Sequence, residues 1–193
     1  MPVIHVYHPE GVLDSDRKAA LAQRLTDVLL DMEGGARSSG GMSFATVLFS
    51  EVATSDWWVG GRTDSTYVHP PGKFLARVNV PEGYMSQVDK TNVHVAVNNA
   101  IVEVARTSDS PDQGASVMVI IDEIAEGNWG VQGKTISLAS IADTVGLSKD
   151  GERFRWVRDY FAAKARLFGI AKYPPNTGGL LNDEVRTLDG KNH

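Results

Sequence analysis

The sequence predicts an α/β fold, or α+β in some schemes, in which two duplicated β-α-β units form a four-stranded mixed sheet with both helices on one face. Two observations predict it. The halves 2–61 and 74–133 match at a constant offset of 72 residues without a gap, and each half places one helical stripe between two strand-like runs. The matched positions are Pro9-Glu10-Gly11 with Pro81-Glu82-Gly83, Lys18 with Lys90, Glu51 with Glu123, Trp57 with Trp129 and Gly61 with Gly133.

Each half begins with a short strand and a helix. The runs 3–8 and 75–80 are rich in β-branched residues, and each is stopped by a proline that cannot donate to a sheet ladder. Asp14 or Ser15 is expected to cap the first helix and Ser86 the second. The apolar stripes are Leu21, Leu25, Val28, Leu29 and Met32 in the first helix and Val93, Val97, Ile101 and Val104 in the second.

Longer apolar runs at 44–52 and 117–124 predict the second strand of each unit, covered on both faces and central in the sheet. A crossover helix makes the two strands of a unit parallel, and a glycine-containing hairpin follows each half. Because the helices cover only one face, the apolar opposite face predicts association with another subunit or with the C-terminal segment.

Three further segments complete the chain, one inside the first half and two outside the repeat. We expect a flexible turn at 36–41, a linker at 62–73, and a C-terminal helical extension and tail at 140–193 after the tandem repeats of 1–139. In the extension, residues 150–169 predict an amphipathic helix with one apolar face: Phe154, Val157, Phe161, Ala165 and Phe168. Beyond Pro174-Pro175 the chain is polar, and a frayed end is expected.

Composition excludes several classes of protein. The net charge of -5 and the lack of long like-charge runs argue against a nucleic-acid or anionic-membrane partner, and the absence of cysteine excludes disulfides and thiolate metal sites. No run of 18 apolar residues and no signal peptide are found, so a cytoplasmic location is expected. The histidines show no metal-ligand spacing, and no metal is expected.

The N-terminal PVIHVYH after Met1, the DWWVGG of the first half and the IDEIAEGNWGVQGK of the second resemble the tautomerase superfamily. The joint order over residues 2–135 is most similar to fused members of the group containing 4-oxalocrotonate tautomerase and cis-3-chloroacrylic acid dehalogenase. The resemblance implies a catalytic N-terminal proline, a small carbonyl or enol substrate, no cofactor and a homotrimer. Residues 140–193 fall outside it.

Pro2 is the expected catalytic residue. Once Met1 is removed, its ring carries a secondary amine whose position is fixed, and an α-amino group titrates near neutrality, at about 7.7 to 8.0. Such a nitrogen can take a proton and its conjugate acid can return it to a different carbon. If Met1 were retained, Pro2 would be an amide without basicity.

The substrate-binding arginines of the relatives are absent. Their positions, together with the helix histidine, strand tyrosine and acidic residue of the dehalogenases, fall here on Val12, Tyr84, Thr46, Met118, Pro81, Leu29, Ile120 and Asn128. Without guanidinium forks for a carboxylate, dicarboxylate and haloacrylate substrates are not expected. Dehalogenase activity is therefore not expected either.

The remaining candidates suggest a less polar site. Trp57, Trp58 and Trp129 lie in segments that bring the pocket aromatic in the family, and each could instead be a core or interface residue. Asn128 resembles the pocket asparagine of macrophage migration inhibitory factor and could hydrogen-bond an enolate oxygen, or simply form a turn. Tyr84 could donate its hydroxyl to the same oxygen.

Arg62 and Arg77 are the best remaining cations for substrate binding. Arg77 shares a strand face with Asn79, and it is expected to be either a substrate-carboxylate ligand or half of an inter-subunit ion pair. Glu51 and Glu123 repeat in register, which suits a structural hydrogen-bond role better than paired acid-base work.

These observations predict a cofactor-free tautomerase or isomerase that uses Pro2 for keto-enol or 1,3-proton transfer. The alternatives are a non-catalytic binding or scaffold protein on the same fold, and a dehalogenase-like or hydratase-like relative with an altered substrate. A ferredoxin-like α+β barrel, as in small monooxygenases or ligand sensors, is a third possibility, and the gap-free repeat argues against it.

Overall fold

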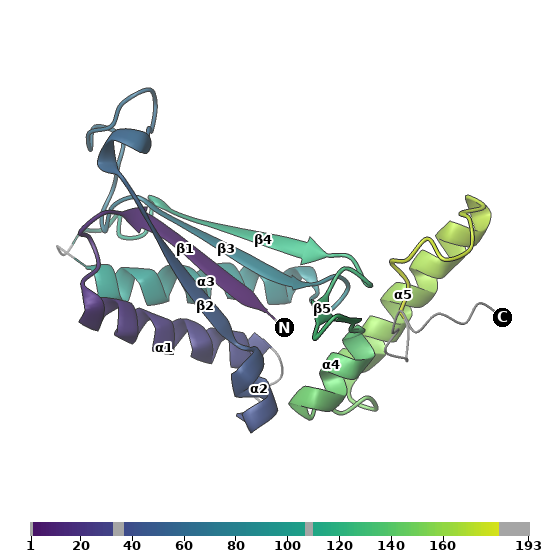
Figure 1. Cartoon of the computed structure of the whole chain (residues 1–193). Coiled ribbons are helices and arrows are strands. Elements are labelled where there is room, and N and C mark those ends of the chain that lie inside the picture. The colour runs from purple at the N-terminus through teal and green to yellow at the C-terminus, as the bar shows by residue number, and fades with distance from the viewer. Residues whose placement is uncertain (1, 33–36, 107–109, 182–193) are drawn as a thin grey trace.

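The computed structural model describes residues 2–32, 37–106 and 110–181 and has a single main sheet with the order β2-β1-β3-β4 (Figure 1). The first unit comprises β1 (Val3–Pro9), α1 (Ser15–Met32) and β2 (Thr46–Val52). The second comprises β3 (Phe74–Pro81), α3 (Gln87–Ala105) and β4 (Val117–Ile124). Strands β1 and β2 are parallel, β3 and β4 are parallel, and β1 and β3 pair antiparallel. The duplicated four-stranded mixed sheet is confirmed.

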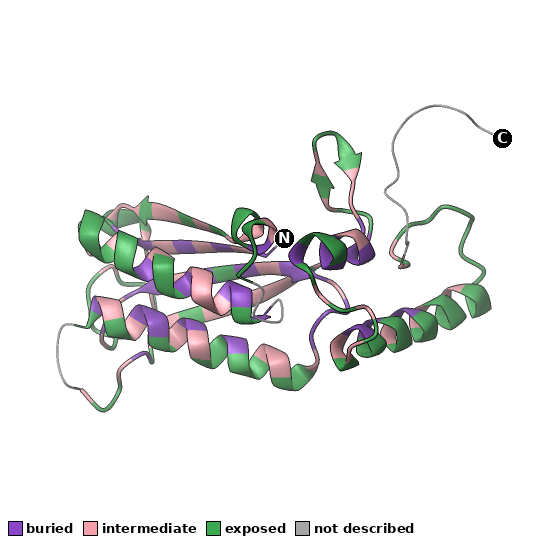
Figure 2. Ribbon diagram, turned by 90° about the horizontal axis from the view of Figure 1, so that it is seen from below, coloured by how far each residue is buried: buried purple, intermediate pink, exposed green. Residues whose placement is uncertain are grey.

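Both helices lie on the same face of the sheet, and their buried stripes turn toward it (Figure 2). Their starts follow the expected capping rules. The carboxylate of Asp14 accepts from the Arg17 backbone N–H at 2.8 Å, and Ser86 forms a capping box with Asp89. The core is therefore a single layer between α1, α3 and the sheet, and it contains the central strand residues Ile4, Val6, Ala76 and Val78.

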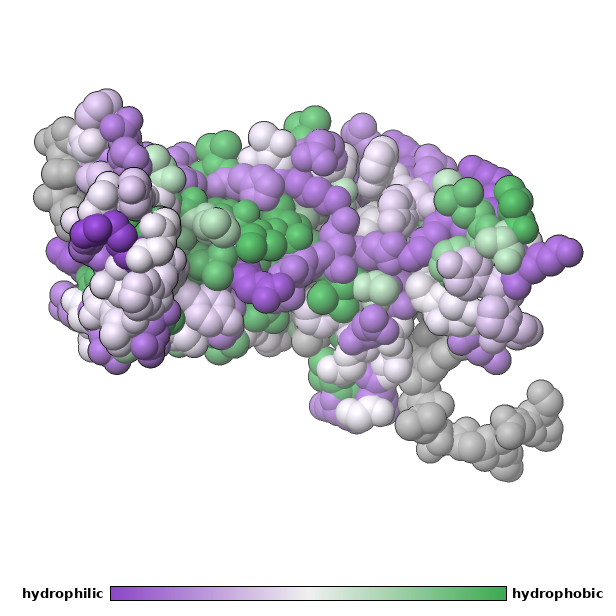
Figure 3. Space-filling view, turned by 90° about the horizontal axis from the view of Figure 1, so that it is seen from above, coloured by the Kyte–Doolittle hydropathy of each residue, from purple (hydrophilic) through white to green (hydrophobic). Residues whose placement is uncertain are grey.

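The expectation that the two long apolar runs lie centrally is wrong, because β2 and β4 are the edge strands. Each crossover returns beside its own first strand, which leaves β1 and β3 to pair in the middle. The runs are apolar for another reason. Alternate residues face the core, while Leu48, Met118 and Ile120 on the opposite face are 48%, 60% and 38% exposed. Figure 3 looks onto this open sheet face and shows apolar side chains gathered there.

The segment predicted as a flexible turn at 36–41 is partly helical. A short helix, α2 (Ser39–Phe44), takes up its second half and the first residue of the run predicted as strand, while residue 36 lies outside the described residues. Ser38 starts this helix, since its hydroxyl accepts from the Gly41 N–H at 3.0 Å. Gly40, one of the glycines that suggested a turn, packs closely against Thr144 instead, as described below.

The duplication extends to an ion pair at the same place in each half. Lys18 of α1 contacts Glu51 of β2 at 2.7 Å, and Lys90 of α3 contacts Glu123 of β4 at the same distance. Both pairs tie a helix to the edge strand that follows it, which confirms the structural role expected for the two glutamates. The lysine lowers the pKa of Glu51 by a hydrogen bond and by its charge.

After β4 come a small hairpin, β5 (Gly130–Val131) and β6 (Lys134–Thr135), and two helices, α4 (Leu138–Val145) and α5 (Glu152–Ile170). The predicted C-terminal helix is confirmed as α5, while α4 was not foreseen. Phe154, Val157 and Phe161 of α5 are buried in the same core as the sheet. The second half of α5 projects beyond the sheet, where Ala165 is exposed (Figures 1 and 2).

Glu82, in the turn after β3, fastens α5 to the repeat. Its carboxylate accepts from Lys164 at 2.6 Å and from the Tyr160 hydroxyl at 2.7 Å. Burial opposes ionisation, yet the hydrogen bonds from Lys164 and Tyr160 hold the pKa of Glu82 below its usual value. Burial and the same carboxylate raise the pKa of Tyr160 to about 12.

We expect Glu82→Gln to lower the free energy of unfolding at pH 7 by about 2 kcal/mol, because Lys164 and Tyr160 lose a charged acceptor. A depressed carboxyl pKa stabilises the fold above the unfolded-state pKa, and this contribution disappears as pH falls through the lower folded-state value. The variant should therefore lose less stability than wild type between pH 5 and pH 2. Urea titrations at each pH measure this. Glu10→Gln, at the exposed equivalent position of the first half, is the control and should behave like wild type.

Among the described residues, no helix combines the length and the apolar character needed to cross a membrane.

Candidate active site

Pro2 lies at the start of β1 and is buried in a small apolar cavity at one end of the sheet. Residues at the end of α1 and at the end of β3 line the cavity together with residues of α4 and Leu147. The lining residues are Met32, Val80, Pro81, Tyr84, Leu138, Ile141, Ala142, Val145 and Leu147. The enclosed volume is about 10 Å³, which is close to the least that holds one water molecule.

The sheet fixes the position of Pro2. Strand β1 is paired on both sides, with Val3 opposite Thr46 of β2 and Asn79 of β3. The Pro2 carbonyl also accepts the Thr46 N–H at 3.5 Å, so the chain is held up to the proline itself. Met1 lies outside the described residues. A proline held in this way can present its nitrogen to a bound molecule with little freedom of direction.

Tyr84 is the one other predicted site residue that the structure brings to the Pro2 cavity. It is 6% exposed and follows Gly83, whose left-handed backbone (φ +72) turns the chain. A side chain at Gly83 would lie 2.4 Å from the Tyr160 ring, so this turn is packed tightly against α5. The guanidinium of Arg153 lies 5.2 Å from the Tyr84 ring centroid and donates to the Met32 carbonyl at 2.7 Å.

Asn128 and Trp129 lie in the turn between β4 and the small hairpin, and neither lines the Pro2 cavity. Asn128 is exposed, and its backbone N–H closes a turn on the Ala125 carbonyl at 3.0 Å. The Trp129 ring nitrogen is buried without a hydrogen-bond partner in the described part of the chain. Within one chain these two residues therefore form a turn beside the extension.

Trp57 and Arg62 lie at the opposite end of the sheet from Pro2. Strand β2 starts beside Val3 and ends beside Pro9, and both residues follow that far end (Figure 1). The Trp57 carbonyl accepts from buried Lys73 at 2.8 Å. Arg62 is exposed and pairs with Asp64, which raises the pKa of Arg62 and lowers that of Asp64.

Arg77 lies on the open face, away from the Pro2 cavity, and forms a two-point contact with Asp122 of β4 at 2.9 and 3.0 Å. The hydrogen bond that Arg77 donates to the Asp122 carboxylate raises the pKa of Arg77. The expected alternatives were a substrate carboxylate or an inter-subunit ion pair, and the partner is instead an aspartate of the same chain. The reason is register, since Arg77 pairs with Ile120 and Asp122 lies two residues further on the same face.

Sequence reasoning missed the α4 wall of the cavity. A signal for it exists, because Leu138, Ile141, Ala142 and Val145 follow helical spacing between a serine cap and Gly146. No cluster of three or more histidine, aspartate or glutamate side chains that could hold a metal ion occurs in residues 2–32, 37–106 and 110–181.

The duplicated β-α-β sheet is the arrangement found in tautomerase-type proteins. Residues 1–140 match the family model Tautomerase_3, described as "Putative oxalocrotonate tautomerase enzyme". The chain belongs to this tautomerase family, as the sequence predicts. Its C-terminal segment begins where the match ends.

Solved structures share the fold. The "F6 fused 4-OT wild type asymmetric trimer" is 24% identical, with a TM-score of 0.55 over 69% of this chain and 94% of that one. Pt0534 inactivated by 2-oxo-3-pentynoate is 16% identical, with a TM-score of 0.56 over 72% and 98%. N1, a member of the cis-3-chloroacrylic acid dehalogenase family, is 18% identical, with a TM-score of 0.57 over 88% and 99%. A search of curated protein sequences finds no match.

Proposed function

We propose that the protein is a cofactor-free tautomerase that moves a proton between two positions of a small carbonyl compound, with Pro2 as general base and then general acid. The observation that carries this proposal is the burial of Pro2 in an apolar cavity at the end of a rigidly paired strand. Membership of the tautomerase family supports it.

The expected reaction needs only two steps. The Pro2 nitrogen takes a proton from the enol oxygen or from the carbon beside the carbonyl, and the resulting ammonium group returns it to the other position. Apolar surroundings disfavour the ammonium form, which keeps the nitrogen available as a base near neutral pH. Tyr84 lines the same cavity, and we expect its hydroxyl to donate to the oxygen that becomes negative.

The other site predictions require a second copy of the chain. Trp57, Arg62, Arg77, Asn128 and Trp129 do not line the Pro2 cavity of their own chain. Their part in substrate binding stays a prediction, and it depends on which surfaces meet in the oligomer.

Titration of the N-terminal nitrogen tests the proposed role of Pro2. We expect the intact mass to correspond to a chain without Met1, and the ¹⁵N resonance of Pro2 to titrate below the usual α-amino range of about 7.7 to 8.0 because its site is apolar. A retained methionine, or a nitrogen that stays protonated well above that range, contradicts the proposal and favours a non-catalytic binding protein. The closed cavity is the observation that keeps this second candidate in view.

We further propose a homotrimer that buries the open sheet face. The exposed Leu48, Met118 and Ile120 on that face support association, and the fused neighbour cited above is a trimer. The double variant Met118→Asp, Ile120→Asp should shift the mass in solution from three chains to one, measured by light scattering. Val95→Asp, at an exposed valine of α3, is the control and should remain a trimer. An unchanged trimer in the double variant contradicts this arrangement.

A further inference from the structure

The Pro2 cavity is too small for any carbonyl substrate while α4 stays in place. Ligand sites of enzymes usually enclose about 300 to 1,000 Å³, whereas this cavity has about 10 Å³. Four of its lining residues, Leu138, Ile141, Ala142 and Val145, belong to α4. Strands β1 and β3 are held in the sheet by their backbone hydrogen bonds, whereas α4 lies outside the sheet.

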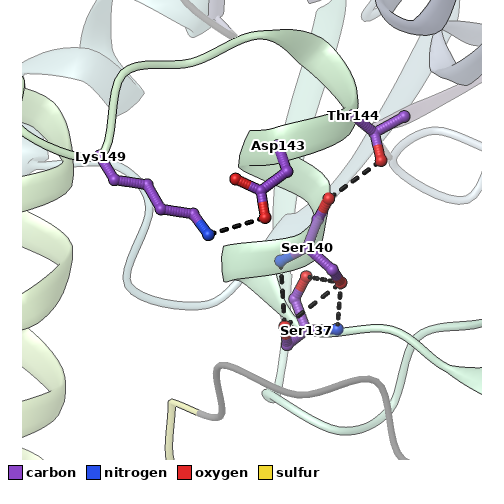
Figure 4. Close-up of polar contacts among 5 residues, drawn as sticks. All are labelled: Ser137, Ser140, Asp143, Thr144 and Lys149. Carbon is purple, nitrogen blue, oxygen red and sulfur yellow. Dashed lines mark hydrogen bonds and ion pairs between the residues drawn. The ribbon is translucent and has the colours of Figure 1, made fainter.

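Polar groups near both ends of helix α4 form local hydrogen bonds (Figure 4). Ser137 and Ser140 form a capping box, and the Leu138 N–H donates to the Glu126 carboxylate at 3.1 Å. The other end stops at Gly146 in the left-handed conformation. Lys149 donates to Asp143 at 2.7 Å across that stop. Apart from the bond to Glu126, these bonds lie within residues 137–149, so α4 can shift and keep its capping box and its C-terminal stop.

Helix α4 has apolar side chains on the cavity side. On the side of α2, its backbone at Thr144 lies very close to Gly40. A Cβ atom added at Gly40 of α2 would lie 2.3 Å from the Thr144 carbonyl oxygen. Because a Cβ atom cannot lie that close to a carbonyl oxygen, any residue other than glycine at position 40 would push α4 away from α2. No α2 residue lines the cavity, so a larger residue at position 40 would act on the cavity only by displacing α4.

We infer that α4 is a movable wall of the Pro2 site: it must shift away from α2 to admit substrate, and its apolar face selects carbonyl compounds with an aryl or branched alkyl group. This inference rests on the proposed reactivity of Pro2. It adds that residues 138–147, which extend past the family match at residue 140, determine substrate size.

Covalent labelling of Pro2 tests the movement. The probe is 2-oxo-3-pentynoate: the amine nitrogen bonds to the alkyne, the triple bond becomes a double bond and the amine proton moves to the neighbouring carbon. The adduct mass is the sum of protein and reagent. Gly40→Ala should label up to about tenfold faster than wild type, since the reactive fraction rises when the closed state is disfavoured. Gly169→Ala, in α5 with open space around it, is the matched control and should label at the wild-type rate.

A second variant tests selection by size without altering the contact with α2. For each variant we compare the rate of labelling by a phenyl-substituted alkynone with the rate of labelling by 2-oxo-3-pentynoate. Ile141→Ala should raise the ratio of these two rates about tenfold above the wild-type ratio, because a buried isoleucine is removed from the wall. Ile170→Ala, at an 80% exposed isoleucine, should leave the ratio unchanged.

The outcomes separate the two proposals. Equal labelling rates in wild type and a folded Gly40→Ala variant, or an unchanged ratio in Ile141→Ala, overturn the role of α4 and leave the reactivity of Pro2 standing. Absence of label at Pro2 in wild type and in every variant overturns both. Faster hydrogen exchange of the α4 amides in Gly40→Ala, with unchanged exchange in β1 and β3, supports the movement independently of Pro2 chemistry.

Discussion

Pro2→Ala is expected to lower kcat/KM for a phenylenolpyruvate-like enol by about 10² to 10⁴, the usual contribution of a positioned general acid-base group. The variant retains an α-amino group after methionine removal but loses the ring that fixes the nitrogen. Steady-state kinetics with the enol prepared fresh measures the loss. The secondary structure should be unchanged, because position 2 precedes the first ladder residue of β1.

Pro111→Ala is the matched control, since Pro111 is exposed in the turn before β4, and it should keep wild-type activity. Full activity in Pro2→Ala would falsify the proposed base. Loss of activity together with loss of circular dichroism would show a folding effect, and a Pro2→Gly variant that stays folded then decides the question by the same kinetic measurement.

Phe154→Ala should cost about 3 to 5 kcal/mol of folding free energy, the range for removing a buried aromatic ring. Phe154 is 1% exposed and belongs to the core cluster that includes residues of β1, α1 and β3. The whole chain should therefore unfold in one transition at a lower urea concentration. Unfolding followed by far-ultraviolet circular dichroism and by tryptophan fluorescence, at one fixed protein concentration, measures this.

Trp156→Ala on the same helix is the control. Trp156 is 48% exposed, and its removal should cost no more than about 0.5 kcal/mol. Two separate transitions in Phe154→Ala, with only the second at the wild-type midpoint, would show that residues 140–193 form an independent unit and not part of the common core.

The order and type of the repeat elements could be predicted from the sequence because local rules decide them. Proline stops, serine and aspartate caps and helical stripes act within a few residues of each other. The position of β2 and β4 in the sheet could not be predicted in this way. A continuous apolar run is expected of a central strand covered on both faces. An edge strand gives the same pattern when its open face also carries apolar residues, as it does here at Leu48, Met118 and Ile120.

The candidate site, too, could be predicted from the sequence only in part. Pro2 and Tyr84 are the two predicted residues that meet in the cavity, and both lie next to strand ends that the sequence marks, Pro2 before β1 and Tyr84 after the turn that follows β3. Trp57 and Arg62 lie far from Pro2 because β2 runs parallel to β1, a relation that sends the segment after β2 to the other end of the sheet. The wall formed by α4 was missed because an eight-residue helix gives a short pattern.

The alignment of the two halves also bears on the number of proposed reaction centres in one chain. The position equivalent to Pro2 in the second half is Phe74, which is buried at the start of β3. An internal residue has no free amine whatever its side chain, so the reaction centre proposed at Pro2 has no counterpart in the second half. At that position of the second half, the Phe74 ring is buried and fills part of the interior.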